Sequence, residues 1–469
     1  MTLRKILPLL LMTSLALAAS SDDMPVHSLT LDDFVEKALK VGIQGKENEL
    51  SVESAGYTRE IAFRQTDSPT FTLNHTSARG ETTTSGLPAL SNSQQTNMSM
   101  NETTPIGTTL NAVGQWANSG GTLGPAGTVA QPGFTANVTQ PLYIFVKNAV
   151  RRTRQTAELN FASAKDTFDA AVLSIRTQAR SLYYNVMLDD ESIDVAARKA
   201  ASSRKLLEVT QALVDAGKSA PVDAMRAKLT LQEDERQLNN AVVIRDQAVL
   251  NAKNYILWPL DQPVHFTTRL QFKAFDKNVD RLVAFAMIHN PTLHSLQRQQ
   301  DLAQLSYEAS VEPTRPTFAL NGTYGDSQIN YPFTVTHDWS WTGTINWLFF
   351  DSFVTRDQAR TALIARWVAD LNVKNAEWTT EVNVRNAYMD VKRTEKQIVD
   401  FRASREQAQR NVEIVRLRFR NGLDRLIDVF DAETQMHDLD TEYLGLLVTY
   451  NQSKDTLSQM IGADVETVQ

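Results

Sequence analysis

Two very long stretches of the chain, in which apolar and polar residues are mixed, contain neither glycine nor proline, the residues that most disfavour a helix interior. They cover residues 142–216 and 344–421, and each ends at a glycine, Gly217 or Gly422, before a second, shorter helical run. At about 1.5 Å per residue, an unbroken helix of that length would be roughly 100 Å long. Helices in globular proteins have about a dozen residues. The pattern therefore predicts an extended helical structure.

The two halves of the chain repeat one another. The pattern Arg-x-x-Tyr-x-x-Val occurs at residues 180–186 and again at 385–391. A Pro-x-Phe-x-Leu-Asn segment likewise precedes each long stretch, at residues 69–74 and 316–321. Because self-similar halves normally form one structural body, we interpret the chain as two internal repeats.

Period-two alternation marks strands between the helices of each half. In residues 339–347 every odd position is apolar or glycine and every even position is Ser, Thr or Asn. Shorter alternating runs occur at residues 318–324, 71–73 and 134–138. This pattern predicts strands with one apolar face. Segments of about ten residues with aromatic side chains near their ends fit strands of a transmembrane barrel, and a half-exposed soluble sheet is the alternative.

The number of strands has a consequence for assembly. Two strands per half give four per chain, and four strands are too few to close a barrel in lipid. An open edge would leave backbone groups unpaired in hydrocarbon, so we expect the chain to share its barrel with copies of itself. Further strand-like stretches at residues 95–103 and 106–117 are either an extra hairpin or an extension of the barrel.

The N-terminus predicts export. Arg4 and Lys5 precede an apolar run over residues 6–18, which is typical of a signal peptide cleaved after Ala18. The run is too short for a spanning helix. The chain has no cysteine, which excludes disulfides and a lipid-bearing N-terminal cysteine. Its net charge of −7 argues against nucleic acid as a partner.

The chain resembles the TolC-like family of outer-membrane efflux and secretion channels, also called outer membrane factors. The resemblance rests on the two-fold repeat, on Gln140-Pro141-Leu142 leading into a long helix, and on residues 418–432, where Gly422 ends one helix and an Asp-x-x-Asp begins the next. Residues 346–348, Asn-Trp-Leu, keep the place of the Gln-Pro-Leu in the second half but depart from its sequence.

The resemblance implies a mainly α fold with membrane β-structure. Three chains would form a long α-helical barrel continuous with a shared, twelve-stranded transmembrane β-barrel, and each chain would carry two internal repeats. The implied location is the cell outer membrane, with the helices extending into the periplasm. The implied partners are two further copies of the chain, a periplasmic adaptor (membrane fusion) protein, an inner-membrane transporter and outer-membrane lipid, with no cofactor.

The expected organisation follows from these patterns. A signal peptide covers residues 1–18. The first channel repeat covers residues 19–260, with strands at about 69–141 and long helices at about 147–257. A linker covers residues 261–277. The second repeat covers residues 278–462, with strands at about 317–347 and long helices at about 352–461, before a tail at 463–469.

The chemistry expected of the chain is that of a gate. Asp428 and Asp431 lie three residues apart and share one face of a helix. Repeated around a symmetry axis, they would form two acidic rings that repel one another and attract cations. The resemblance implies that these are constriction aspartates. The local alternative is that they are helix N-terminal acids stabilised by the helix dipole.

Other tip residues have expected roles as well. Asp223 and Arg425 are candidate partners linking the two tips, and Asp424 occupies a place where the family often has a basic residue. Gly217 and Gly422 are expected to end their helices with positive φ. Lys218 and Leu423, which follow them, are candidate contacts for the adaptor.

No enzyme is expected. The seven histidines are scattered without metal-ligand spacing, and no phosphate loop or nucleophile motif occurs. The chain is interpreted as a passive exit duct of a tripartite efflux or type I secretion system. The alternative is a coiled-coil structural or surface protein without a pore, which leaves the alternation at residues 339–347 unexplained. The sequence does not identify the cargo as a drug, a metal ion or a polypeptide.

Overall fold

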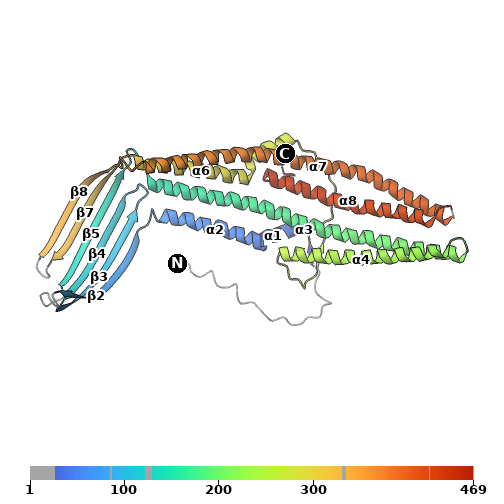
Figure 1. Ribbon diagram of the computed structural model, residues 1–469, viewed down its shortest axis with the longest axis horizontal. Coiled ribbons are helices and arrows are strands. Elements are labelled where there is room, and N and C mark those ends of the chain that lie inside the picture. The colour runs from blue at the N-terminus through green and yellow to red at the C-terminus, as the bar shows by residue number, and fades with distance from the viewer. Residues whose placement is uncertain (1–26, 85–86, 122–128, 330–333, 422, 468–469) are drawn as a thin grey trace. The chain divides into compact units, whose positions relative to one another are not determined.

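The computed structural model describes residues 27–84, 87–121, 129–329, 334–421 and 423–467 (Figure 1). The expected signal peptide, residues 1–18, lies outside the described residues. The chain divides into two compact units. Unit 1 contains the described residues up to Lys46 together with Ser174–Asp276 and Ala387–Leu457. Unit 2 contains Glu47–Leu173, Lys277–Asn386 and the described residues from Ser458 onward.

Unit 2 contains an antiparallel sheet of six strands in the order β2-β3-β4-β5-β7-β8. The strands are β2 Thr70–Thr84, β3 Leu87–Thr103, β4 Thr109–Gly121, β5 Val129–Leu142, β7 Thr317–Ile329 and β8 Thr334–Asn346. The expectation of two strands per half is wrong for the first half, which supplies four. The stretches at residues 95–103 and 106–117 belong to the additional hairpin, β3–β4. The sequence left its place in the sheet open, because β3 is rich in Ser, Asn and Gln and has few apolar positions.

In its central rows the sheet has one mainly apolar and one mainly polar face, in line with the alternation, although Gln94, Thr96 and Glu102 of β3 share the apolar face. Paired residues on neighbouring strands point to the same face. The apolar face carries Phe71, Leu73, Met98, Met100, Leu110, Ala112, Phe134, Val138, Leu320, Tyr324, Trp339, Trp341 and Ile345. The polar face carries Thr72, Asn97, Ser99, Asn101, Asn111, Asn137, Asn321, Thr323, Ser340 and Thr342. In the single chain the large apolar side chains are exposed, Leu73 and Trp339 each to 74%.

The helices repeat with nearly equal lengths. α3 (Ala149–Asp215) and α7 (Val354–Arg420) each have 67 residues, while α4 (Pro221–Tyr255) has 35 and α8 (Leu426–Ile461) has 36. Neither α3 nor α7 contains glycine or proline, the residues that most disfavour a helix interior. Shorter helices precede each sheet segment: α1 (Leu31–Lys40) and α2 (Ile43–Arg64), then α5 (Val279–His289) and α6 (Pro291–Val311).

Within the described part of the chain, none of these helices combines the length and the apolar character that crossing a membrane requires.

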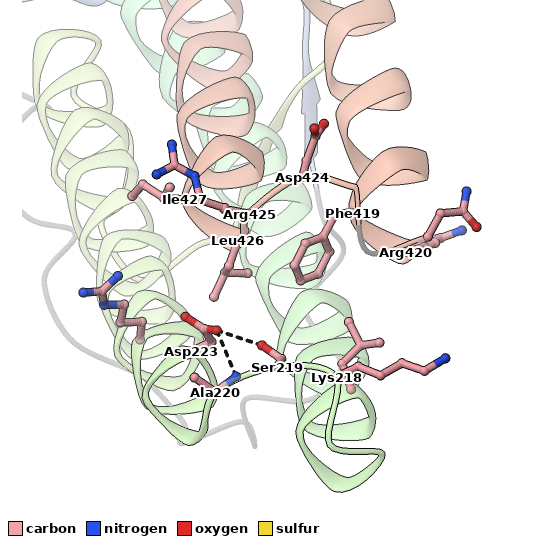
Figure 2. Close-up of a pocket in the computed structure, with 13 residues that line it drawn as sticks. Lys218, Ser219, Ala220, Asp223, Phe419, Arg420, Asp424, Arg425, Leu426 and Ile427 are labelled. Carbon is pink, nitrogen blue, oxygen red and sulfur yellow. Dashed lines mark hydrogen bonds between the residues drawn. The ribbon is translucent and has the colours of Figure 1, made fainter.

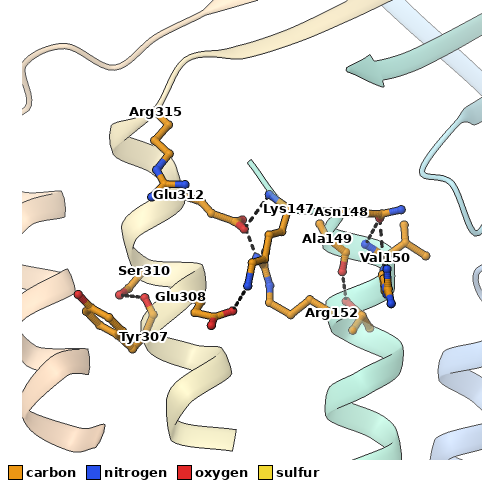
Figure 3. A network of polar contacts seen from close by, with 12 residues as sticks. Lys147, Asn148, Ala149, Val150, Arg152, Tyr307, Glu308, Ser310, Glu312 and Arg315 are labelled. Carbon is orange, nitrogen blue, oxygen red and sulfur yellow. Dashed lines mark hydrogen bonds and ion pairs between the residues drawn. The ribbon is translucent and has the colours of Figure 1, made fainter. Parts of the chain in front are cut away.

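The junction between β5 and α3 in unit 2 is held by charged side chains from the end of α6 (Figure 3). Lys147 donates its backbone N–H to Glu312 at 3.1 Å and its Nζ to Glu308 at 2.6 Å. Arg152, on the first turns of α3, donates to the other carboxylate oxygen of Glu312 at 2.5 Å. Asn148 caps α3 by accepting from the backbone N–H two residues on, at 2.9 Å. The chain therefore leaves the sheet in a fixed direction.

Two buried tyrosines fix the linker segment in unit 1. β1 (His27–Leu29) pairs in parallel with β6 (Val264–Phe266), and Tyr183, which is fully buried, lies beside them. Its hydroxyl donates to the Leu29 carbonyl at 3.0 Å and accepts from the N–H of Thr268 at 2.8 Å. Tyr450, also fully buried, donates to the Lys273 carbonyl at 2.6 Å. Both hydroxyls thus tie a buried ring to the backbone of the linker, and the Leu29 carbonyl also accepts from the Thr267 N–H at 3.2 Å.

Candidate functional site at the helix–turn–helix tips

The first tip joins α3 to α4 through Gly217, whose φ is +71°. The N–H of Gly217 donates to the Val214 carbonyl at 2.9 Å, and that of Lys218 donates to the Leu213 carbonyl at 2.8 Å. This pair of bonds is the Schellman arrangement, which requires a residue in the left-handed region. α4 then begins at Pro221, whose fixed φ suits the first helical position. The result is a short, tightly bonded turn.

The second tip joins α7 to α8 in a similar way. The N–H of Leu423 donates to the Arg418 carbonyl, five residues earlier, at 2.9 Å. Lys218 makes the equivalent bond in the first tip. Gly422, expected at the left-handed position, lies outside the described residues. The Arg418 guanidinium also forms an ion pair with Asp424 at 2.9 Å, and the Asp424 side chain is only 16% exposed.

An aspartate begins the second helix of each tip. Asp223 accepts from the Ala220 N–H at 3.3 Å and from the Ser219 hydroxyl at 2.7 Å. Asp428 accepts from the Arg425 N–H at 3.0 Å and from its guanidinium at 3.2 Å. A carboxylate in this position also benefits from the positive end of the helix dipole. Each acid is therefore a local cap within its own tip.

The Arg425–Asp428 pair changes the protonation of both groups. The side-chain hydrogen bond from Arg425, followed by the bond from its backbone N–H, holds the pKa of Asp428 below its usual range. The same pair raises the pKa of Arg425, and the charge of Asp431 contributes to that rise. At neutral pH Asp428 and Arg425 are therefore both charged.

A groove of 620 Å³ lies between the two tips, and Figure 2 shows the side chains that line it. Its charged lining consists of Lys218, Arg226, Arg420, Arg425, Asp223 and Asp424. Phe419 and Leu426 also line it, and both are buried against Leu206, Ala227 and Val429. The groove thus has a packed apolar base beneath a ring of mixed charges, in which cations outnumber acids.

The structure brings several of the predicted residues to this groove. Asp223 and Arg425 line the same cavity, but Arg425 is paired with Asp428, and Asp223 with Ser219 and Ala220. Asp431 is exposed and lies one turn beyond Asp428 on α8.

The residues after the turns are also exposed. Leu423 is 70% exposed, and Lys218 is exposed beside the groove.

Sequence reasoning missed a buried polar link between the two tips. Glu433 on α8 is only 5% exposed, yet it accepts from Arg416 of α7 at 2.7 Å and from Ser202 of α3 at 3.1 Å. Arg416 also donates to Ser202 at 2.5 Å. This triad joins the first half of the chain to the second. Its only signal in the sequence is an acid, Glu433, directly after Ala432 in the apolar part of α8.

Further buried acids hold the helix pairs together. Asp234 of α4, which is 2% exposed, pairs with Lys199 of α3 at 3.1 Å. Asp440 of α8, which is 6% exposed, pairs with Arg405 of α7. His437 lies nearby, and burial followed by the charge of Lys199 lowers its pKa. Over the described residues, no cluster of three His, Cys, Asp or Glu side chains has the geometry of a metal site.

Comparison with known families identifies the chain. Residues 46–254 and 282–463 match the family described as outer membrane efflux protein. The chain belongs to this family. Membership confirms the expected resemblance, the outer-membrane location and the expectation of a channel protein that is not an enzyme. The two matched segments also agree with the two expected repeats.

Solved structures share the fold. The chain is similar to the CmeC outer membrane channel of Campylobacter jejuni (TM-score 0.68, 16% identity, covering 92% of this chain and 85% of that one). It is similar to the outer membrane protein VceC of Vibrio cholerae (0.69, 13%, 92% and 96%). It also resembles the open state of the Neisseria gonorrhoeae MtrE outer membrane channel (0.70, 16%, 93% and 89%). A comparison with curated protein sequences found no match. Long helices with an antiparallel sheet confirm the expected fold class.

Proposed function

We propose that this protein is the outer-membrane exit duct of a tripartite efflux or type I secretion system. It is a passive trimeric channel, and its energy comes from an inner-membrane transporter through a periplasmic adaptor. The observation that carries the proposal is the two-faced sheet of unit 2. Its edge strands, β2 and β8, each have one neighbour among the described strands. Because an open edge in lipid is costly, these edges call for further copies of the same sheet.

The closed end of the duct is assigned to the tips. Asp428 and Asp431 share one face at the start of α8, and three copies around an axis would place two acidic rings in a narrow passage. Cations would be attracted to such rings, and anions would be repelled. The capping role of Asp428 is compatible with this, because a cap also fixes where the carboxylate points.

We assign opening of the channel to an exchange of ion pairs at the tips. Arg425 is bonded to Asp428, while Asp223 lines the same groove. We assign the Asp223–Arg425 link to a second state of the tip, in which Arg425 leaves Asp428. The Arg418–Asp424 pair would hold the turn during this exchange. The buried Ser202–Arg416–Glu433 triad would act as the hinge point, because it ties the moving helices α7 and α8 to α3.

We assign the compact turns as the docking site for the adaptor. Gly217 allows the tight bend of the first tip, and Lys218 and Leu423 present one cationic and one apolar side chain just after the two turns. Efflux of small compounds and secretion of polypeptides need the same duct. The transporter that co-purifies with the chain would therefore decide between them: a proton-driven pump for efflux, an ATP-binding cassette exporter for secretion.

The first test is the mass of the mature protein extracted from outer membranes in mild detergent, by light scattering corrected for bound detergent. We expect three chains per particle. A monomer that is soluble without detergent would overturn the proposal and favour a coiled-coil envelope protein without a pore.

A further inference from the structure

We propose that the β3–β4 hairpin stands in the wall of the membrane barrel, so that three copies form an eighteen-stranded barrel. The family resemblance implied twelve strands, or four per chain. This chain has six, and the two additional strands lie inside the sheet, between β2 and β5. The inference rests on the proposed trimer, but it concerns the size of the pore rather than the existence of the pore.

One apolar row of paired residues crosses the hairpin, from Phe71 through Met100, Ala112 and Ala136 to Tyr324 and Trp339, although Thr96 and Gln94 of β3 share this face. Met98 and Met100 on β3 lie opposite Leu73 and Phe71 of β2. On β4, Ala112 lies opposite Ala136 of β5, and the nearby positions of that face are Leu110, Gly114 and Trp116. Met98 and Trp116 are 57% and 55% exposed in the single chain. A hairpin lying in water outside the wall would have no reason to keep this face apolar, whereas a lipid-facing one requires it.

The polar face continues as well, and its side chains are bonded from strand to strand. One row of paired residues runs through Asn101, Asn111 and Asn137 on three successive strands. Asn111 donates to Asn101 at 2.5 Å, and Asn137 donates to Asn111 at 3.3 Å. These amides form an uncharged ladder on the face opposite the lipid-facing side chains. In a closed barrel this face lines the water-filled interior.

The turn of the hairpin is fixed to the base of the wall. Asn148, the residue that caps α3, donates to the Pro105 carbonyl in this turn at 2.9 Å. Gly107 has φ +84°, and a Cβ built there would lie 1.7 Å from the Tyr143 hydroxyl. Thr108 is also hydrogen-bonded to Gln140 of β5. The hairpin therefore starts and ends at the same level as its neighbours.

A register that aligns the ends of β2 and β8 in adjacent copies is compatible with closure. The row that begins at Thr70 on β2 passes through paired residues to Ser340 on β8, six residues before the end of β8 at Asn346. If Asn346 lies opposite Thr70 of the next copy, each chain shifts the row by six residues over six strands. With a rise of about 3.4 Å per residue and a strand spacing of about 4.8 Å, the strand tilt is about 35°. Outer-membrane barrels have tilts of roughly 35–45°.

The size of the pore follows from the number of strands. Barrel diameter grows roughly linearly with strand number, so eighteen strands give about 1.5 times the diameter and about 2.2 times the enclosed area of twelve. Barrels of this class enclose an aqueous channel. The outer mouth of this duct would therefore be wider than the resemblance alone implies.

The test compares neighbouring residues on β4 in single-cysteine variants, which the cysteine-free chain makes possible. In outer membranes, Asn111→Cys should react with a water-soluble maleimide, while Ala112→Cys should react at least tenfold more slowly. Thr342→Cys and Trp341→Cys on β8 form the matched control pair, since β8 is in the wall whether or not the hairpin is. Equal labelling of Asn111→Cys and Ala112→Cys, with the β8 pair still distinct, would overturn the inference and leave the proposed function intact.

A second measurement tests the closure itself. Thr72→Cys combined with Thr344→Cys should form disulfide-linked trimers, because the six-residue stagger places these residues opposite each other in adjacent copies. Thr72→Cys combined with Thr323→Cys on the interior strand β7 should not form them. Trimers by light scattering without this cross-link would overturn the stagger. Loss of the trimer in the unmodified protein would instead count against the proposed function.

Discussion

Asp223 and Asp428 cap the second helix of their tips in the same way. Each carboxylate accepts a hydrogen bond from the backbone N–H three residues before it, at 3.3 Å and 3.0 Å. Only Asp428 also binds a guanidinium, that of Arg425. The two positions therefore separate the effect of a helix cap from the effect of the pore-facing charge that we propose for Asp428.

The first prediction uses this pairing. Asp428→Ala together with Asp431→Ala should raise the conductance of the closed channel severalfold in planar bilayers and reduce its preference for cations, because both acidic rings are lost. Asp223→Ala removes the equivalent cap in the first tip, at a cost of about 1 kcal/mol. It should leave the ion preference unchanged. An equal change in both variants would mean that loss of the cap, and not of the acidic rings, opens the tip.

The second prediction concerns pH. The pKa of Asp428 is held below its usual range by Arg425. A group whose pKa is lowered by folding adds stability above its unfolded pKa of about 3.9, and this stability is lost as the pH falls through the folded value. Conductance of the closed channel should therefore stay constant from pH 7 to pH 5 and rise only below about pH 4. An increase between pH 7 and pH 6 would contradict the assignment and direct attention to His437.

The third prediction concerns the buried triad. Arg416→Ala would leave Glu433 buried without its cation, and breaking such a pair typically costs about 3–5 kcal/mol. We expect a loss of stability at the lower end of that range, since the Arg416 side chain is 39% exposed. Arg410→Ala is the control, because its partner Glu406 lies four residues away and both side chains are exposed. Such surface pairs contribute about 0–1 kcal/mol. Thermal unfolding of the detergent-extracted protein would compare the two.

The fourth prediction contrasts two glycines with positive φ. Gly107→Ala should strongly reduce the amount of assembled protein in the outer membrane, because the new Cβ would overlap the Tyr143 hydroxyl. Gly217→Ala places its Cβ in open space, so only the backbone conformation is penalised, by about 1 kcal/mol. Immunoblots of heat-stable oligomers would measure both. Similar losses for the two variants would show that the contact with Tyr143 is not what matters.

Much of the fold could be predicted from the sequence because its signals are local. The absence of glycine and proline predicted α3 and α7. The alternation of apolar residues with Ser, Thr and Asn predicted β8. Residues 95–103 of β3 were predicted to be strand-like but were not assigned to the barrel, because with Ser and Asn on both faces only Met98 and Met100 mark the apolar side of that stretch. Its membership in the sheet becomes visible only through the partners on either side of it.

The site was less accessible to sequence reasoning. The pairing of Asp428 with Arg425 lies within one turn, yet the partner expected for Arg425 was Asp223 in the other tip. Short-range pairs form readily because little chain entropy is lost in closing them. The Ser202–Arg416–Glu433 triad could not be predicted, since it depends on the alignment of three helices distant in the sequence.

The insertion of a complete hairpin has an evolutionary consequence. A pair of strands returns the chain to the side from which it left, so strand polarity alternates as before and β5 still delivers the chain to the cap of α3. A single added strand would reverse every later direction. If the hairpin stands in the barrel wall as we propose, the bore of the exit changes in steps of one hairpin per copy, with no change required in the helices.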